Sequence, residues 1–322
     1  MTVAPHLQQT GEQPAHVVAY PGARYGKRAD IDHDSQMALE SAEYSARMAV
    51  NVARSAAFPR FDWLTGYREL LRTLLRREIR KRYKGSALGI VWSLVYPLAM
   101  MGVYTLVFSV LWRTAGNIPH YPLFVLTGLA VWGFFQAGVQ LGTSSLIGNA
   151  DLVKKVWFPR ELIPAAAVLA QLTTSLVMFV ILVPANLIAV PATAKTMALA
   201  FPIFGALVCL ALGFAWLLSI VNVFFRDVEH LLAVLFLPWF FLTPVLYGLE
   251  QLPAAASHRW LIDVMRYGNP VTPYVEGFRA TLLQATVPGA SLLVYIFVVG
   301  PTLALLGLWV VQRYEDRLAV EL

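Results

Sequence analysis

Long uncharged stretches separated by short charged segments dominate the pattern of this sequence. They occupy residues 85–112, 121–150, 162–194, 196–225, 231–249 and 280–312. Each is longer than the roughly 18 apolar residues from which a membrane-spanning helix is inferred. Pro97, Pro184, Pro238 and Pro301 fall inside these stretches, where neighbouring helices can satisfy the backbone groups that a proline frees. We therefore predict six spanning helices.

Composition agrees with this pattern, since 58 % of the 322 residues are hydrophobic and only 14 % are charged. A soluble domain of this length carries far more charge. The fold class predicted is an all-α integral membrane protein. Its expected parts are a flexible polar tail over residues 1–60, an amphipathic helix over 61–87, a six-span domain over 88–312 and a short basic tail over 313–322.

The helix ahead of the first span carries basic residues on one side and leucines on the other. Apolar side chains recur at helical spacing between Tyr67 and Ile79, which predicts a helix lying in the membrane interface. Its cations either anchor the chain to anionic lipid or hold a phosphorylated headgroup of a substrate, because guanidinium groups match phosphate oxygens. The candidate residues are Arg72, Arg76, Arg77, Arg80, Arg82 and Lys84.

A charged segment over residues 151–163 separates the second and third stretches, so it lies at a membrane surface. Lys154, Lys155 and Arg160 make it basic, and Trp157 and Phe158 are apolar groups that a simple connector would not need to expose. These aromatics either dip into the aromatic belt of the interface or dock a soluble protein. The choice stays open from the residues alone.

Residues 250–279 are semi-apolar and interrupted by Pro253, Pro270 and Pro273. This segment is too broken to span a bilayer, and it follows the shortest apolar stretch. Such irregular backbone is tolerated at membrane depth only where protein buries it. We expect a re-entrant hairpin between the fifth and sixth spans.

The positions of lysine and arginine predict the orientation. All but five of the 25 lie on the side that holds both termini; the exceptions are Arg113, Lys195, Arg259, Arg266 and Arg279. Because basic loops stay in the cytoplasm, both termini are expected there. Cys209 is the single cysteine, which excludes an intramolecular disulfide, and the first 30 residues carry no apolar signal segment.

Several chemistries are missing from the sequence. No apolar stretch has an acidic residue near its middle to relay protons or sodium, and no complete phosphate-binding loop is present, so ATP hydrolysis is expected in another subunit. The short loop from Arg113 to His120 lacks a carboxylate, which argues against a membrane glycosyltransferase. We predict a membrane subunit driven by a separate ATPase, with no catalytic residue, metal or cofactor in this chain.

Four motifs sharpen this prediction. They are the run over residues 75–97 with its Arg-Tyr-Lys-Gly-Ser-x-Leu-Gly core, the loop over 153–161, Phe225-Arg-Asp227 and Gly268-Asn-Pro270. With these motifs in this order, the chain from Tyr67 to Gln312 resembles the permease subunits of type-2 ABC exporters. The resemblance is specifically to exporters that move O-antigen, teichoic acid, capsule or galactan chains. Residues 1–66 are not part of the resemblance.

The resemblance implies that two copies of the chain assemble with two ATPase subunits, which bind ATP and magnesium, in a bacterial plasma membrane. The expected cargo is a polysaccharide linked to a lipid pyrophosphate, and no nucleic acid is involved. The loop would be the coupling helix, with contacts at Lys154, Lys155, Trp157, Phe158, Pro159, Arg160 and Glu161. Expected channel-lining residues, if they are not ordinary packing aromatics, are Trp92, Tyr96, Trp239 and Tyr247; expected gate residues are Asn269, Pro270, Glu276 and Arg279.

Two alternatives stay open. A type-2 ABC permease that exports a drug or a lipid would share the architecture. A membrane glycosyltransferase belongs to another class and would transfer sugar without an ATPase.

Overall fold

The structure is a computed structural model that describes residues 67–85, 89–111, 118–155, 158–252 and 258–321. Every regular element in these ranges is helical. The predicted tail over residues 1–60 lies outside them. The longer helices are α3 (Arg68–Tyr83), α4 (Trp92–Thr105), α5 (Tyr121–Ser144), α7 (Leu162–Ala189), α8 (Ala200–Phe224), α9 (Val228–Leu242), α12 (Thr272–Leu282) and α13 (Ala290–Glu321).

Short elements fill the connections. A π-helical turn over Leu106–Leu111 continues α4, and α6 (Ala150–Lys155) lies between α5 and α7. α11 (Arg259–Asp263) continues as a second π-helical turn over Val264–Gly268, which precedes α12.

Five helical segments are long and apolar enough to cross a membrane: Gly89–Leu111, Tyr121–Ser144, Leu162–Ala189, Met197–Phe224 and Ala290–Glu315. They match five of the six predicted spans, so the chain is a multi-pass membrane protein. The remaining one is α9, an apolar helix of 15 residues. At a rise of 1.5 Å per residue it is about 22 Å long, which is less than a typical hydrocarbon core of about 30 Å.

One predicted boundary is wrong. The apolar stretch over residues 280–312 is not a single helix, because α12 ends at Leu282 and α13 begins at Ala290. Between them Ala285 has the left-handed φ of 54°, and Pro288 and Gly289 follow. A search for uncharged stretches does not register this turn, because Gln284, Thr286, Pro288 and Gly289 carry no charge. At its other end α13 continues past Gln312 to Glu321, so residues 313–321 of the predicted tail extend the last helix.

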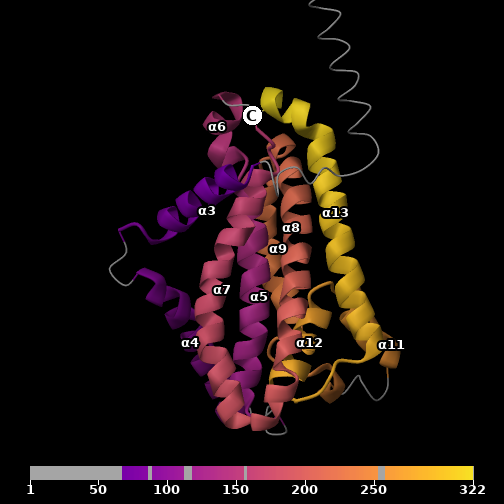
Figure 1. Cartoon of the computed structure of the whole chain (residues 1–322). Coiled ribbons are helices and arrows are strands. Elements are labelled where there is room, and N and C mark those ends of the chain that lie inside the picture. Colours follow the sequence, from indigo (N-terminus) through magenta and orange to yellow (C-terminus); the bar gives the residue numbers. More distant parts are fainter. Residues whose placement is uncertain (1–66, 86–88, 112–117, 156–157, 253–257, 322) are drawn as a thin grey trace, which may run out of the picture. The chain divides into compact units, whose positions relative to one another are not determined.

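The helices form a bundle with α5 and α8 at its centre. α5 packs against α4, α7, α8 and α12, whereas α8 also packs against α13 along much of its length. Figure 1 shows α3 and α6 at one end of the bundle and α11 and α12 at the other. We call these the α6 end and the α12 end.

At two glycines the contact between α8 and α13 brings backbone against backbone. A Cβ atom built on Gly213 would lie 2.6 Å from the carbonyl carbon and oxygen of Leu303. A Cβ atom on Gly300 would lie 2.5 Å from the carbonyl oxygen of Ala206. Small residues of this kind let two helices approach closely inside a membrane, where burial of apolar surface gives little driving force.

Gly213→Ala should therefore lower the thermal stability of the purified protein in detergent. The added methyl group meets backbone that cannot move aside, and overpacking of this kind costs about 1–3 kcal/mol. Gly205→Ala is the matched control, because Gly205 lies in the same helix and a Cβ atom there meets nothing within 4 Å. Thermal unfolding of the two variants should differ, and equal midpoints would contradict the close contact.

Candidate functional site

The loop at the α6 end has an exposed part and a buried part. The lysines of the exposed part, Lys154 and Lys155, lie at the end of α6, while Val153 turns into the core. Trp157 lies outside the described residues. The predicted coupling surface therefore has two cations that a partner can reach.

The buried part of the loop corrects the expectation that Phe158 is exposed. Its side chain is only 3 % accessible and belongs to the hydrophobic core. Arg160 and Glu161 are buried as well, at 9 % and 4 % accessibility. The carbonyl of Pro159 accepts a hydrogen bond from the amide of Leu162 and so starts α7. Phe158, Arg160 and Glu161 thus attach the loop to the bundle, while Pro159 is half-buried.

Glu161 connects the loop to two other helices. Its carbonyl oxygen accepts a hydrogen bond of 3.0 Å from Nε1 of Trp216 on α8. Its carboxylate oxygen Oε1 accepts one of 3.0 Å from Nε2 of Gln312 on α13. These hydrogen bonds link the loop to α8 and α13, a connection that the sequence reasoning missed because neither partner lies near the loop in the chain.

The basic residues of α3 divide into two groups. Arg76, Arg77, Arg80 and Lys84 are exposed and, together with Thr73 and Lys81, line an open concavity of about 510 Å³. Arg72 also lies on the surface, but it forms an ion pair of 2.5 Å with Glu69.

Arg82 behaves differently, because α3 packs against α7 and this side chain faces that contact. Its Nη1 donates to Oγ1 of Thr174 at 2.9 Å and to Oε1 of Gln171, both on α7. Next to it, the hydroxyl of Tyr83 lies 3.0 Å from Oγ of Ser93 and 3.2 Å from Oγ1 of Thr174. Arg82 therefore helps to hold α3 against the bundle.

The four predicted channel-lining aromatics are not in one place. Trp92 and Tyr96 stand on α4 with 54 % and 66 % of their surface accessible and line cavities between α4 and its neighbours. Trp239 belongs to an aromatic cluster, with its ring 5.4 Å from Phe135. The hydroxyl of Tyr247 donates to the carbonyl oxygen of Phe241 at 2.9 Å.

At the α12 end, Asn269 joins the end of α9 to the start of α12. Its Oδ1 accepts hydrogen bonds from Nε1 of Trp239 at 3.0 Å and from the amide of Val271 at 3.1 Å. Its Nδ2 donates to Oγ1 of Thr243 at 2.8 Å. Pro270 follows directly and gives the turn between α11 and α12 its fixed φ.

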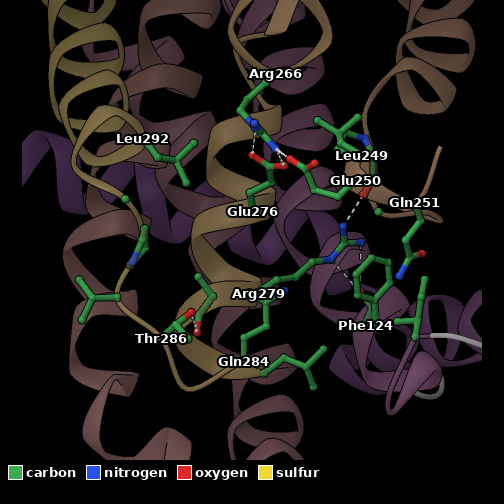
Figure 2. Close-up of a pocket in the computed structure, with 18 of the residues that line it drawn as sticks. Phe124, Leu249, Glu250, Gln251, Arg266, Glu276, Arg279, Gln284, Thr286 and Leu292 are labelled. Atoms are coloured by element: carbon green, nitrogen blue, oxygen red, sulfur yellow. Dashed lines mark hydrogen bonds and ion pairs between the residues drawn. The ribbon is translucent and has the colours of Figure 1, made fainter. Parts of the chain in front are cut away.

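Glu276 forms an ion pair that the sequence reasoning did not foresee. Arg266 donates to it at 2.8 Å and also to Glu250 at 2.7 Å, as Figure 2 shows. Hydrogen bonds and the charges of the two carboxylates raise the pKa of Arg266, and the hydrogen bond to Glu276 has the largest effect. Together they outweigh burial, which lowers this pKa. The three residues line a cavity of about 730 Å³ and tie the loop after α9 to α12.

Arg279 borders the same cavity but is only 3 % accessible. Its guanidinium carbon lies 3.3 Å from the centre of the Phe124 ring (Figure 2). Burial lowers the pKa of Arg279, the charge of Glu276 opposes this, and a guanidinium stays protonated at neutral pH. All its nitrogens donate to backbone carbonyls, those of Phe124, Pro244, Val245 and Tyr247.

These contacts use the whole donor capacity of the guanidinium. Arg279 therefore holds the start of α5, the segment after α9 and α12 together and has no donor left for a ligand. The predicted gate residues do gather at the α12 end, but Arg266, Glu250 and Thr243, which connect them, were not predicted. The charges of Arg266 and Glu250 are visible in this semi-apolar segment and are the signal that could have found them.

Arg279→Lys should destabilise the protein although it keeps the charge. A lysine cannot reach carbonyls in four directions, and each buried acceptor left without a partner costs about 1–3 kcal/mol. Thermal unfolding in detergent measures the loss. Arg259→Lys, a change at an exposed position of α11, is the control and should leave the unfolding midpoint unchanged. An equally small effect of both substitutions would contradict the carbonyl contacts.

Comparison with known proteins gives consistent matches. Residues 69–283 match the sequence model of a family described as ABC-2 type transporter. An O-antigen export system permease protein RfbA of Myxococcus xanthus is 32 % identical over 256 residues, which cover 78 % of this chain and 93 % of the relative. Two proteins of the same name from Klebsiella pneumoniae are 26 % and 28 % identical, each covering 78 % of this chain and 94 % of the relative.

Proposed function

Because this chain belongs to the ABC-2 type transporter family, we propose that it is the membrane subunit of an ATP-driven exporter of a lipid-linked polysaccharide. The observation that carries the proposal is the 32 % identity to an O-antigen export permease over 93 % of that protein. Residues 69–283, which match the family model, include most of α3, the loop between α5 and α7, and the elements α11 and α12. The cargo would be a glycan of O-antigen or galactan type.

We place the protein in the cytoplasmic membrane of a bacterium with both termini and the α6 end in the cytoplasm. The excess of lysine and arginine on that side supports this orientation. α3 would lie in the cytoplasmic interface, with its exposed arginines against anionic lipid or the diphosphate of the cargo. α9 would be the sixth, short span, completed at the outer face by the re-entrant pair α11 and α12.

The energy would come from a separate ABC ATPase that binds ATP and magnesium, with two copies of each subunit in the exporter. Lys154 and Lys155 support a docking surface in the loop between α5 and α7, because both are exposed at the proposed cytoplasmic end. Glu161 would then pass the movement of this loop on to α8 and α13. The predicted role of Trp157 remains part of this proposal.

A permease for a drug or a lipid would use the same helices, and a membrane glycosyltransferase would need no ATPase. The relatives are named O-antigen export permeases, which favours a polysaccharide exporter over a drug or lipid exporter and over a glycosyltransferase. Deleting the gene from its host separates the three. We expect the surface polysaccharide to disappear while the finished glycan accumulates on its lipid carrier inside the cell, as measured by extraction and glycan electrophoresis.

Normal surface polysaccharide in the deletion strain would contradict the proposal and favour a drug or lipid exporter. Loss of the polysaccharide without accumulation of the lipid-linked glycan would point to a glycosyltransferase. Restoring the gene on a plasmid is the control, and it should return the glycan to the surface.

Lys154→Glu combined with Lys155→Glu should weaken the association with the ATPase subunit about tenfold, because charge reversal places repulsion in the interface. Co-purification from membranes that contain both subunits measures the association, and ATP hydrolysis measures the coupling. Lys195→Glu is the control, since Lys195 is exposed at the α12 end. Unchanged association of the double variant would mean that the loop binds lipid instead.

A further inference from the structure

A groove runs along α4, where this helix stands beside α5 and α7. Three adjoining cavities of about 490, 380 and 240 Å³ form it. The first two share Gln140 and Gln171 among their lining residues, and the last two share Tyr96 and Gln136. The cavities therefore neighbour one another, and we call them together the α4 groove. Arg82 borders the groove at the α6 end.

Three glutamines line the α4 groove: Gln136 and Gln140 on α5, one helical turn apart, and Gln171 on α7. All three belong to helices that are long and apolar enough to cross a membrane. An amide group inside hydrocarbon costs free energy unless it has hydrogen-bond partners, so polar residues at this depth usually mark a pathway. Their gathering around one cavity indicates a polar occupant.

The carbonyl oxygens of two of these amides are used within the protein. Oε1 of Gln136 accepts from Nε1 of Trp132 at 2.7 Å, and Oε1 of Gln171 accepts from Arg82. Among the described residues, no acceptor takes a hydrogen bond from Nε2 of Gln136 or of Gln171. Gln140 Nε2 reaches only the carbonyl oxygen of Glu229 at 3.5 Å. The groove thus offers amide N–H donors that require acceptors from an occupant.

The remaining walls suit a sugar ring. Trp92 and Tyr96 on α4 present aromatic surface to the groove, and aromatic faces pack against the C–H face of a pyranose ring. Gly133 and Ala137 on α5 supply little bulk on the other side, so the cavity stays open. A lipid acyl chain would fill the space but would leave the N–H donors of the glutamines without partners, at about 1–3 kcal/mol for each.

A cation marks one end of the groove. Arg82 donates only to the neutral oxygens of Gln171 and Thr174, and no carboxylate in the part of the chain that the structure describes forms an ion pair with it. Its charge is therefore available to an anion. An amphiphile with an anionic headgroup at Arg82 and a hydroxyl-rich unit beyond it matches the order of these groups.

We propose that the α4 groove binds the sugar unit next to the diphosphate of a lipid-linked glycan. The sugar hydroxyls accept hydrogen bonds from Gln136, Gln140 and Gln171, the ring packs on Trp92 and Tyr96, and the diphosphate lies near Arg82. This inference rests on the proposed function and adds to it the residues that distinguish a glycan carrier from a bare lipid.

Binding to the purified protein tests the inference. The probes are undecaprenyl diphosphate carrying one N-acetylhexosamine and undecaprenyl diphosphate without sugar, each followed by native mass spectrometry in detergent. The sugar-bearing probe should bind about tenfold more tightly than the bare lipid, as two or three added hydrogen bonds predict. Gln136→Met, which has no amide, should lose this advantage, whereas Arg82→Gln should weaken binding of both probes.

A steric variant provides a second, independent arm. Gly133→Leu fills the groove, and a Cβ atom there meets nothing within 4 Å, so the backbone accepts it. It should abolish the advantage of the sugar-bearing probe. Gly205→Leu is the matched control, because it makes the same change in another apolar helix, also with open space, at a position that lines none of the three cavities.

Equal affinity of the wild-type protein for the two probes, or an unchanged advantage in Gln136→Met and Gly133→Leu, would overturn the inference. Failure of the proposed function is distinguishable from this outcome. It appears as normal surface polysaccharide in the deletion strain, whereas failure of the α4 groove alone appears as full export by cells that carry Gln136→Met.

Discussion

The absence of water from the hydrocarbon region is the constraint on which this structure depends, because each polar group placed there needs a partner from the protein or from a ligand. Arg279 has such partners: it donates hydrogen bonds to backbone carbonyls and stacks on the ring of Phe124. Glu161, which is buried in protein at the α6 end, likewise has partners on α8 and α13. The glutamines of the α4 groove meet this constraint only in part within the protein, and that difference separates residues that hold the bundle together from residues that await an occupant.

The two ends of the bundle solve different problems. At the α6 end, exposed lysines stand on a loop whose other residues are anchored in the core, so the loop is both accessible to a partner and connected to the spans. At the α12 end, the short helix α9 leaves room that α11, α12 and their ion pairs fill. Between the ends, α4 contributes no buried residue and stands at the side of the bundle, which leaves the groove open.

Much of the architecture could be predicted from the sequence because the length of an apolar run is a local property. The boundary near residues 280–289 does not appear in a search for uncharged stretches, since the turn around Ala285 carries no charge. Pro288 and Gly289, which are typical of a turn, were the signal that could have placed it. Phe158 shows a second limit of prediction from sequence. An aromatic residue in a basic loop gives the same sequence pattern whether its side chain packs into the core or contacts a partner protein. The glutamines inside the spans are visible in the sequence. They were missed because only acidic residues were considered as polar groups within the apolar stretches.

The backbone contact between α8 and α13 gives these two helices a mechanical property that side-chain packing would not. Where backbone meets backbone at Gly213 and Gly300, no side chain lies between the two helices that could change rotamer to let one slide past the other. At the α6 end, Trp216 on α8 and Gln312 on α13 each donate a hydrogen bond to Glu161. At the other end, both helices contact α12. A movement of the loop would therefore reach the α12 end through α8 and α13 together.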